Sequence, residues 1–394
     1  MHKTLNIIAL AILLIATSCS NKYSEPIQNA LAQSGNNAHE LEMALAHFKG
    51  EQKEALEFLI QYMPKHDLEE LSAEYLIENI KYAYIARNDY AWAKNLDKDV
   101  FFNEVLPYAS LNERRDYWRP DFYKRFSKYV SDASSIEETI WAINNNILNE
   151  LNVEYNTDRE KPDQSPYESM ELGMASCSGL SILLVDAFRS VGIPARVAGT
   201  PDWFNNSGNH NWVEVYVNGQ WHFTEYYPSG TFDEAWFLER AGKADKSKPE
   251  QWMYASSFKP TKLHFPLVWD DNIKYVHAVD VTDRYIDLYQ KELARNNSQN
   301  SVELQVVMLK NEDCSLAGNN RVKAEVSLIA NGETINSGET SGSIDDMNRY
   351  LTFKVEKGTD FSLSFINANG QLVSKKMTAI SENQQIILFH NQKI

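Results

Sequence analysis

Apolar residues recur every three or four positions along the first 150 residues of the chain. This spacing places them on one face of a helix. The clearest cases are Leu41, Leu45 and Phe48; Leu56, Leu59, Ile60 and Met63; and Ile136, Ile140, Ile143 and Ile147. Prolines at 64, 107 and 120 interrupt the pattern, because proline does not continue a helix. We therefore expect a helical N-terminal region over residues 19–133.

The last hundred residues show short runs in which apolar and polar side chains alternate, a pattern typical of strands. The runs are VELQVVML, KAEVSLI, YLTFKV, FSLSFI and IILF, with turn sequences at Asn331-Gly332, Gly358 and Asn369-Gly370. The stretch ARNNSQNS, residues 294–301, has the composition of a linker. We expect a β-sandwich, immunoglobulin-like or similar, over residues 299–394.

Between these regions, residues 153–170 are polar, contain Pro162 and Pro166, and are expected to form a loop. A helix followed by strands is predicted from there to about Tyr289. A chain of 394 residues is too long for one ordinary core, so two or three domains are expected. The overall prediction is an α+β protein with a core domain over residues 134–292.

The first residues, MHKTLNIIALAILLIATSCS, have a basic start and an apolar run from Leu5 to Ala16. This run is short for a membrane span and suits a signal peptide over residues 1–18. Small residues precede Cys19, as in the cleavage signal of bacterial lipoproteins. We expect Cys19 to carry a lipid that anchors the chain in the envelope of a Gram-negative bacterium, at the periplasm or outer membrane. The alternative is an ordinary secretory signal with an incidental cysteine.

Charge and composition narrow the classes of partner. The net charge of −16 and the pI near 5.1 argue against nucleic acid. Aromatic residues make up 12% of the chain, which suits large aromatic cores or aromatic-lined grooves. There is no H-E-x-x-H motif and no calcium loop, and Asp270-Asp271 alone is too weak a signal, so no metal and no cofactor are expected.

The segment SCSGLSILLVDAFRSVGIPAR predicts a helix that begins with a thiol. Ser176 suits the N-cap, and Gly192 with Pro194 ends the helix. Cys177 then lies in the first turn, where the helix dipole lowers a thiol pKa and unpaired N–H groups can hold an oxyanion. Alternatively, Cys177 is a small buried residue, or forms a disulfide with Cys314 in an oxidising compartment.

The segment NHNWVEVYVNGQWHFTE predicts a hairpin with a two-residue turn at Asn218-Gly219. Antiparallel pairing then matches Tyr216 with Trp221, Glu214 with Phe223 and Trp212 with Glu225. His210 and Glu225 share a face as diagonal neighbours, with Cβ atoms roughly 7–8 Å apart. Glu214 is roughly 13 Å from His210 along the strand, which is too far to orient the ring. His222 falls on the opposite, valine-rich face.

A histidine held by a carboxylate can take the proton of a thiol. Cys177, His210 and Glu225 are therefore the predicted catalytic residues, as nucleophile, base and orienting acid. The alternative for His210 and Glu225 is a purely structural hydrogen bond. Trp203, Phe204 and Trp212 are expected to wall the substrate cleft, although Trp212 equally suits the core.

These residues resemble the transglutaminase-like superfamily of the papain-like cysteine fold. The shared pattern is a cysteine at a helix start, the GIPAR turn at 192–196, His-x-Trp-Val-Glu-Val at 210–215, and Trp221 with an acid four positions later. The chain departs from it in two places: Glu225 replaces the usual Asp, and Ala175-Ser176 precede the thiol where a glycine is usual, Gly173 being the displaced counterpart. The layout of the whole chain resembles envelope lipoproteins of Bacteroidetes.

The resemblance implies a cysteine hydrolase, a peptidase or amidase, in which water rather than an amine accepts the acyl group. The implied substrate is a peptide or protein, glycan-linked peptides included, and the membrane is contacted only through the lipid anchor. The competing prediction is a surface lipoprotein that binds glycans or peptides with a catalytically weak or inactive site.

Overall fold

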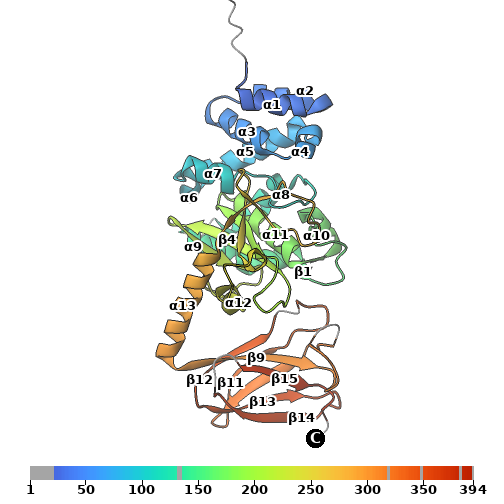
Figure 1. Ribbon diagram of the computed structural model, residues 1–394, viewed down its shortest axis with the longest axis vertical. Coiled ribbons are helices and arrows are strands. Elements are labelled where there is room, and N and C mark those ends of the chain that lie inside the picture. The colour runs from blue at the N-terminus through green and yellow to red at the C-terminus, as the bar shows by residue number, and fades with distance from the viewer. Residues whose placement is uncertain (1–21, 131–134, 317–319, 347–348, 381–383, 393–394) are drawn as a thin grey trace, which may run out of the picture.

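The computed structural model describes residues 22–130, 135–316, 320–346, 349–380 and 384–392, with backbone alone for 296–299. The predicted signal peptide and Cys19 lie outside the described residues. The chain is elongated, with helices at one end, a mixed core in the middle and a sheet-rich region at the other end (Figure 1). Helices and sheets thus combine as the α+β prediction requires.

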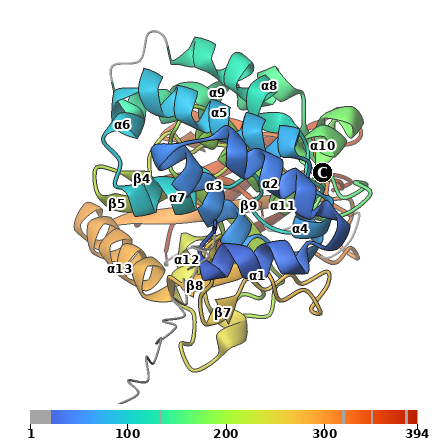
Figure 2. The same cartoon turned by 90° about the horizontal axis from the view of Figure 1, so that it is seen from above.

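The N-terminal region is a stack of helices that covers one end of the core (Figure 2). Its apolar faces form one cluster that includes Leu41, Leu45, Leu56 and Leu59, as the helical spacing predicts. The helices of this region are α1 Glu25–Gln33, α2 Ala38–His47, α3 Gly50–Tyr62, α4 Lys65–Glu70, α5 Ala73–Asp89, α6 Ala91–Lys94 and α7 Lys98–Glu104, with the short 3₁₀ turn η1 Gly35–Asn37. The helices α8 Trp118–Phe126 and α9 Ile136–Leu151 follow, with the 3₁₀ turn η2 Ser127–Tyr129, and pack into the apolar cluster of the core.

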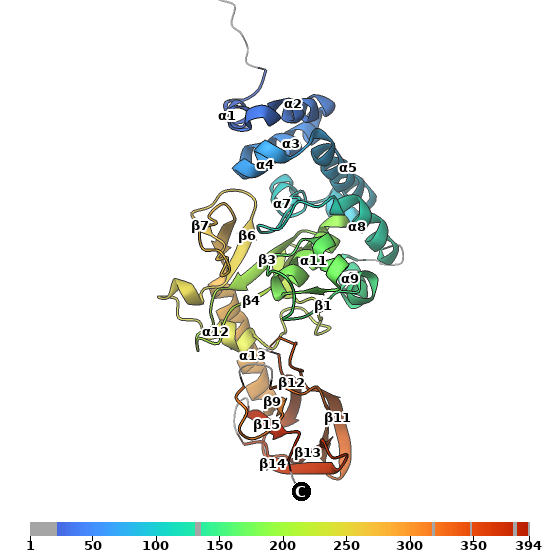
Figure 3. The ribbon, with the colours of Figure 1, turned by 90° about the vertical axis from the view of Figure 1, so that its right-hand side faces the viewer.

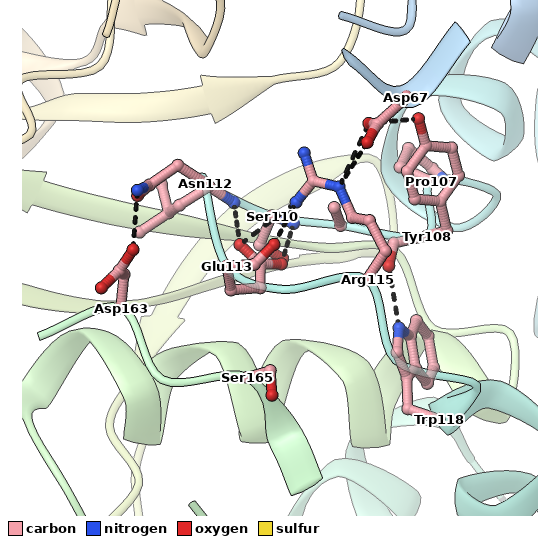
Figure 4. Close-up of polar contacts among 12 residues, drawn as sticks. Asp67, Pro107, Tyr108, Ser110, Asn112, Glu113, Arg115, Trp118, Asp163 and Ser165 are labelled. Carbon is pink, nitrogen blue, oxygen red and sulfur yellow. Dashed lines mark hydrogen bonds and ion pairs between the residues drawn. The ribbon is translucent and has the colours of Figure 1, made fainter. Parts of the chain in front are cut away.

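A polar network fastens this helical region to the segment that leads into the core (Figure 4). Asp67 of α4 accepts hydrogen bonds from Arg115 Nε at 3.0 and 3.1 Å and from the Tyr108 hydroxyl at 2.7 Å. Glu113 accepts from the backbone N–H groups of Ser110 and Leu111 at 2.7 and 2.8 Å. Burial of Asp67 opposes its charge, but the Arg115 guanidinium outweighs this and lowers the pKa of the carboxyl.

The core is built on a six-stranded antiparallel sheet in the order β5-β4-β3-β6-β8-β7. Helix α11 packs on one face, and α12 and α13 lie on the other side (Figure 3). The elements are β1 Glu154–Tyr155, α10 Pro166–Leu172, β2 Met174–Ala175, α11 Cys177–Ser190, β3 Ala195–Thr200, β4 His210–Val217, β5 Gln220–Thr224, α12 Leu238–Gly242, η3 Pro249–Gln251, β6 Tyr254–Ser257, β7 Leu263–His264, β8 His277–Asp280 and α13 Thr282–Gln299.

Two segments differ from the sequence expectation. Residues 153–170, expected as a loop, contain β1 and the start of α10, where Ser165 and Glu168 form a capping box that starts the helix. The expected linker at 294–301 is largely the end of α13, because no glycine or proline stops the helix before Gln299. Tyr285 and Tyr289 bury one face of α13 in the apolar cluster beneath the sheet.

The C-terminal region is a sandwich of two sheets around one apolar cluster, with strand orders β11-β10-β13-β14 and β12-β9-β15. The five strand candidates of the sequence correspond to β9, β10, β12, β13 and β15. Their bounds are β9 Ser301–Leu309, β10 Glu325–Ala330, β11 Glu333–Glu339, β12 Leu351–Glu356, β13 Asp360–Ile366, β14 Leu372–Thr378 and β15 Gln384–Phe389. Within the described residues, no helix is both long and apolar enough to cross a bilayer.

Candidate active site

Cys177 is the first residue of α11, as the sequence predicts. The N-cap is Ser176, whose hydroxyl accepts from Gly179 N–H at 3.2 Å and donates to the Pro162 carbonyl at 2.5 Å. Cys177 is partly buried, and both it and Cys314 are free thiols, so the disulfide alternative is not realised. The first turn of α11 therefore presents a thiol at the positive end of a helix.

The beginning of β4 is held beside this first turn by Asn211. Its side-chain amide donates to the Ser178 hydroxyl at 2.7 Å. The opposing residue on β3 is Gly199, where a Cβ would lie 1.9 Å from Asn211 Oδ1 and 2.8 Å from the His210 carbonyl. Only glycine leaves room for this side chain, so Gly199 allows the strand carrying His210 to dock against the helix carrying Cys177.

The hairpin has the predicted turn and register. Asn218 and Gly219 have φ of 52° and 88°, as a type I′ turn requires. Tyr216 pairs with Trp221 and Glu214 with Phe223. Glu214, excluded as a partner of His210, instead accepts hydrogen bonds from Arg196 and Tyr285 in a buried network beneath the sheet.

His210 and Glu225 make the predicted contact, with Nε2 and Oε1 2.8 Å apart. Glu225 follows the last residue of β5, and Asn144 of α9 fixes this end of the strand. The Asn144 amide donates to the carbonyls of Glu225 and Tyr226 at 2.9 and 3.3 Å, and its oxygen accepts from the Thr224 hydroxyl at 2.8 Å. The carboxylate thus approaches the imidazole from a backbone that is itself held in place.

Burial disfavours the charged form of His210, which is 5% exposed. The hydrogen-bonding and charge interactions with Cys177, followed by those with Glu225, outweigh burial and raise the pKa of His210 well above its ordinary value. Since Nε2 faces Glu225, Nδ1 is the nitrogen available to the thiol. The arrangement favours the imidazolium form of His210 beside the thiol of Cys177.

The three aromatic residues expected to wall the cleft do not line it. Trp203 and Trp212 are 0% and 1% exposed and form an aromatic layer under the His210 ring, so Trp212 takes its alternative place in the core. Phe204 lies on the surface beside Lys243. The indole N–H of Trp212 donates to Tyr285, which fixes this layer against α13.

A pocket opens directly over the thiol, with an empty volume of about 620 Å³ that includes its mouth. Its wall combines the three predicted catalytic residues with aromatic and charged side chains from distant parts of the chain. The lining residues are Tyr155, Cys177, Leu180, Ser181, His210, Asn211, Glu225, Tyr226, Tyr227, Trp236, Asp345, Asp346 and Arg349. The position of Tyr226 and Tyr227 directly after Glu225 was a usable sequence signal, whereas no sequence pattern indicated the residues after 340.

One family of known proteins matches part of the chain. Residues 124–225 match the family model of the transglutaminase-like superfamily. The chain contains a transglutaminase-like domain. The matched span ends at Glu225, so the pocket residues Tyr226, Tyr227, Trp236 and all those of the sandwich lie outside it.

The chain also aligns with solved structures at low similarity. A candidate cysteine protease from Cytophaga hutchinsonii is 22% identical over 34% of this chain and 44% of its own, with a TM-score of 0.27. A TGase is 18% identical over 38% of both chains, with a TM-score of 0.24. Red sea bream transglutaminase is 9% identical over 77% of this chain and 59% of its own, with a TM-score of 0.20. This chain spans less than half the length of the first two. No curated protein matches it.

Proposed function

We propose that the protein is a cysteine hydrolase, a peptidase or amidase, that cleaves a peptide or amide bond through an acyl-thioester at Cys177. The observation that carries the proposal is the orientation of His210. Its Nε2 binds Glu225 at 2.8 Å, while its other nitrogen faces the pocket that contains the free thiol of Cys177.

In the acylation step the Cys177 thiolate attacks the carbonyl carbon and forms a C–S bond. The proton held on His210 Nδ1 passes to the leaving amine as the C–N bond breaks. In deacylation, His210 takes a proton from water, the resulting hydroxide attacks the thioester, and the thiolate leaves as the C–S bond breaks. Glu225 stabilises the imidazolium whenever His210 carries both protons.

Two donors are available for the oxyanion of each tetrahedral intermediate. The first is the backbone N–H of Cys177, which has no hydrogen-bond partner among the described residues. The second is the hydroxyl of Tyr155, which lines the pocket from β1, next to the strand β2 that precedes the thiol. Burial, followed by the charges of Asp346 and Cys177, raises the pKa of Tyr155, so the hydroxyl keeps the proton that it donates.

The proposal is tested by the rate at which iodoacetamide alkylates Cys177 between pH 4 and pH 9. An ion-paired thiolate should react faster than a model thiol below the ordinary thiol pKa of about 8.5. His210→Ala should remove this advantage. His222→Ala is the matched control, since His222 lies on the same hairpin but outside the pocket, and should react like wild type.

A Cys177 that reacts like a model thiol in all three proteins would refute the proposal. The remaining candidate would then be a binding protein whose aromatic pocket holds a peptide or glycan without turnover. Cys177→Ser separates these functions, because it abolishes hydrolysis while leaving binding to the pocket intact.

A further inference from the structure

Described residues of the connection between β11 and β12 form one wall of the pocket over Cys177. The Ile344 carbonyl accepts from Thr157 N–H at 3.2 Å, which joins the connection to the segment after β1. Asp345, Asp346 and Arg349 line the pocket. Asp346 Oδ2 lies 3.5 Å from His210 Nδ1, the nitrogen that faces the reacting groups.

Short-range bonds hold this wall in shape. Asp345 Oδ2 accepts from Gly342 N–H at 2.6 Å, and the Ser341 hydroxyl donates to the Arg349 carbonyl at 3.0 Å. The Arg349 guanidinium stacks over the Tyr227 ring at 4.7 Å. The two carboxyl groups are therefore presented to the pocket by a described segment, residues 341–346, that contacts the core through Ile344 and Asp346.

The charges around the pocket are unequal. Its acidic side chains are Glu225, Asp345 and Asp346, and its basic ones are His210 and Arg349. The Asp346 side chain is 14% exposed, whereas Arg349 is exposed at the mouth and already contacts an aromatic ring. Buried charges are screened less than exposed ones, so the carboxylates dominate the field inside.

The rest of the wall is aromatic, from Tyr155, Tyr226, Tyr227 and Trp236. Aromatic faces combined with carboxylates attract ammonium groups through cation–π and ionic interactions. A thiolate beside an imidazolium, without further acidic groups, would have no such preference, because the imidazolium attracts anions. Asp345 and Asp346 therefore determine that the pocket favours positively charged groups.

We propose that the pocket selects substrates with a primary ammonium group close to the scissile carbonyl, such as a lysine side chain or a free amino terminus, and that Asp345 and Asp346 recognise it. The inference rests on the proposed function of Cys177. It makes the β-sandwich the source of specificity for a reaction carried out by the transglutaminase-like domain.

The test compares Cys177 alkylation by a cationic, a neutral and an anionic reagent, namely 2-bromoethylammonium, iodoacetamide and iodoacetate. Each rate is divided by the rate with a free model thiol, which removes the intrinsic reactivity of the reagent. In wild type we expect the cation to be favoured over the anion by about tenfold or more, the size expected for charges interacting near a protein surface. Asp345→Asn and Asp346→Asn should each reduce that ratio, and the double variant should abolish it.

Asp313→Asn, an exposed aspartate of the sandwich outside the pocket, should leave the ratio unchanged. Asp345→Asn should leave the fold intact, because the amide oxygen can still accept the hydrogen bond from Gly342 N–H. Two results would overturn the inference. In the first, the wild-type protein reacts faster with the anionic reagent than with the cationic one. In the second, the double variant reacts faster with all three reagents by the same factor, which would mean that the two aspartates only limit access to Cys177. If no reagent reacts faster than with the model thiol and His210→Ala changes nothing, the proposed function fails together with it.

Discussion

The hairpin β4–β5 carries two histidine–carboxylate pairs, and their surroundings differ. His210 Nε2 lies 2.8 Å from Glu225, and His222 Nδ1 lies 2.7 Å from Asp233. The His210 side chain is 6% exposed and faces a thiol, whereas the His222 side chain is 27% exposed and packs against the Phe232 ring at a tilt. The two pairs are similar in bond length and differ in what lies on the other side of the ring.

The second pair has a structural role. Asp233 also accepts from Phe223 N–H at 2.9 Å and has a positive φ of 61°, so it pins the segment after β5 to the hairpin. A histidine and a carboxylate at hydrogen-bond distance are therefore insufficient evidence for a catalytic site. The neighbouring thiol, the burial and the pocket distinguish His210, and each provides a way to test the contrast.

The largest expected effect is the difference in kcat/KM between the variants Glu225→Gln and Asp233→Asn. A neutral amide cannot stabilise the imidazolium of His210, so Glu225→Gln should lower kcat/KM for peptide hydrolysis by about 10²- to 10⁴-fold. Asp233→Asn should leave kcat/KM within about twofold and lower the free energy of unfolding by about 1 kcal/mol. Steady-state kinetics and urea unfolding measure both, and equal losses of activity would show that the two pairs are not functionally distinct.

The next largest effect is expected at Tyr155, which lines the same pocket as His210, whereas His222 lies outside that pocket. Removing one oxyanion donor typically costs about 10²-fold in kcat, and Tyr155→Phe should do so with little change in KM. The alkylation rate of Cys177 should stay unchanged, because alkylation forms no oxyanion. Tyr216→Phe, on the hairpin but outside the pocket, is the control. A kcat equal to wild type would exclude Tyr155 as the donor.

The smallest effect is the pH dependence of stability. Against burial, Cys177 and Glu225 raise the pKa of His210 in the folded chain, so protonation favours folding. This contribution is complete below the ordinary histidine pKa of about 6.5 and is lost as pH rises through the raised value. Urea unfolding should show wild type losing stability above neutral pH relative to His210→Ala. His222→Ala should show the same dependence of the free energy of unfolding on pH as wild type. If it showed the dependence of His210→Ala instead, His210 would not be the source of the effect.

The local parts of the fold and site were predictable because they depend on short-range chemistry. Ser176 as a cap, Asn218-Gly219 as a turn and the alternation along β4 determine where the Cys177, His210 and Glu225 side chains point. The sandwich strands β11 and β14 were missed for a related reason. Both are at sheet edges with mostly exposed, polar side chains, so they lack the apolar alternation that identifies a strand.

Long-range placement was not predictable. Trp203 precedes His210 by seven positions and was expected in the cleft, yet its ring fills the layer beneath the histidine. Asp346 is 136 positions after His210 and faces it across a contact between two regions. Neither the depth at which an aromatic side chain packs nor the docking of distant regions is encoded in local periodicity.

The hydrogen bond between Thr157 and Ile344 joins the two regions close to the pocket, and α13 joins them covalently. A recombinant fragment ended before β9 would keep every residue proposed to react and would lose a wall of the chamber in which they react. Turnover by such a fragment would show that the reacting residues are sufficient for hydrolysis. The substrates that the fragment accepts would not be those of the whole protein, because its cleft would be wider.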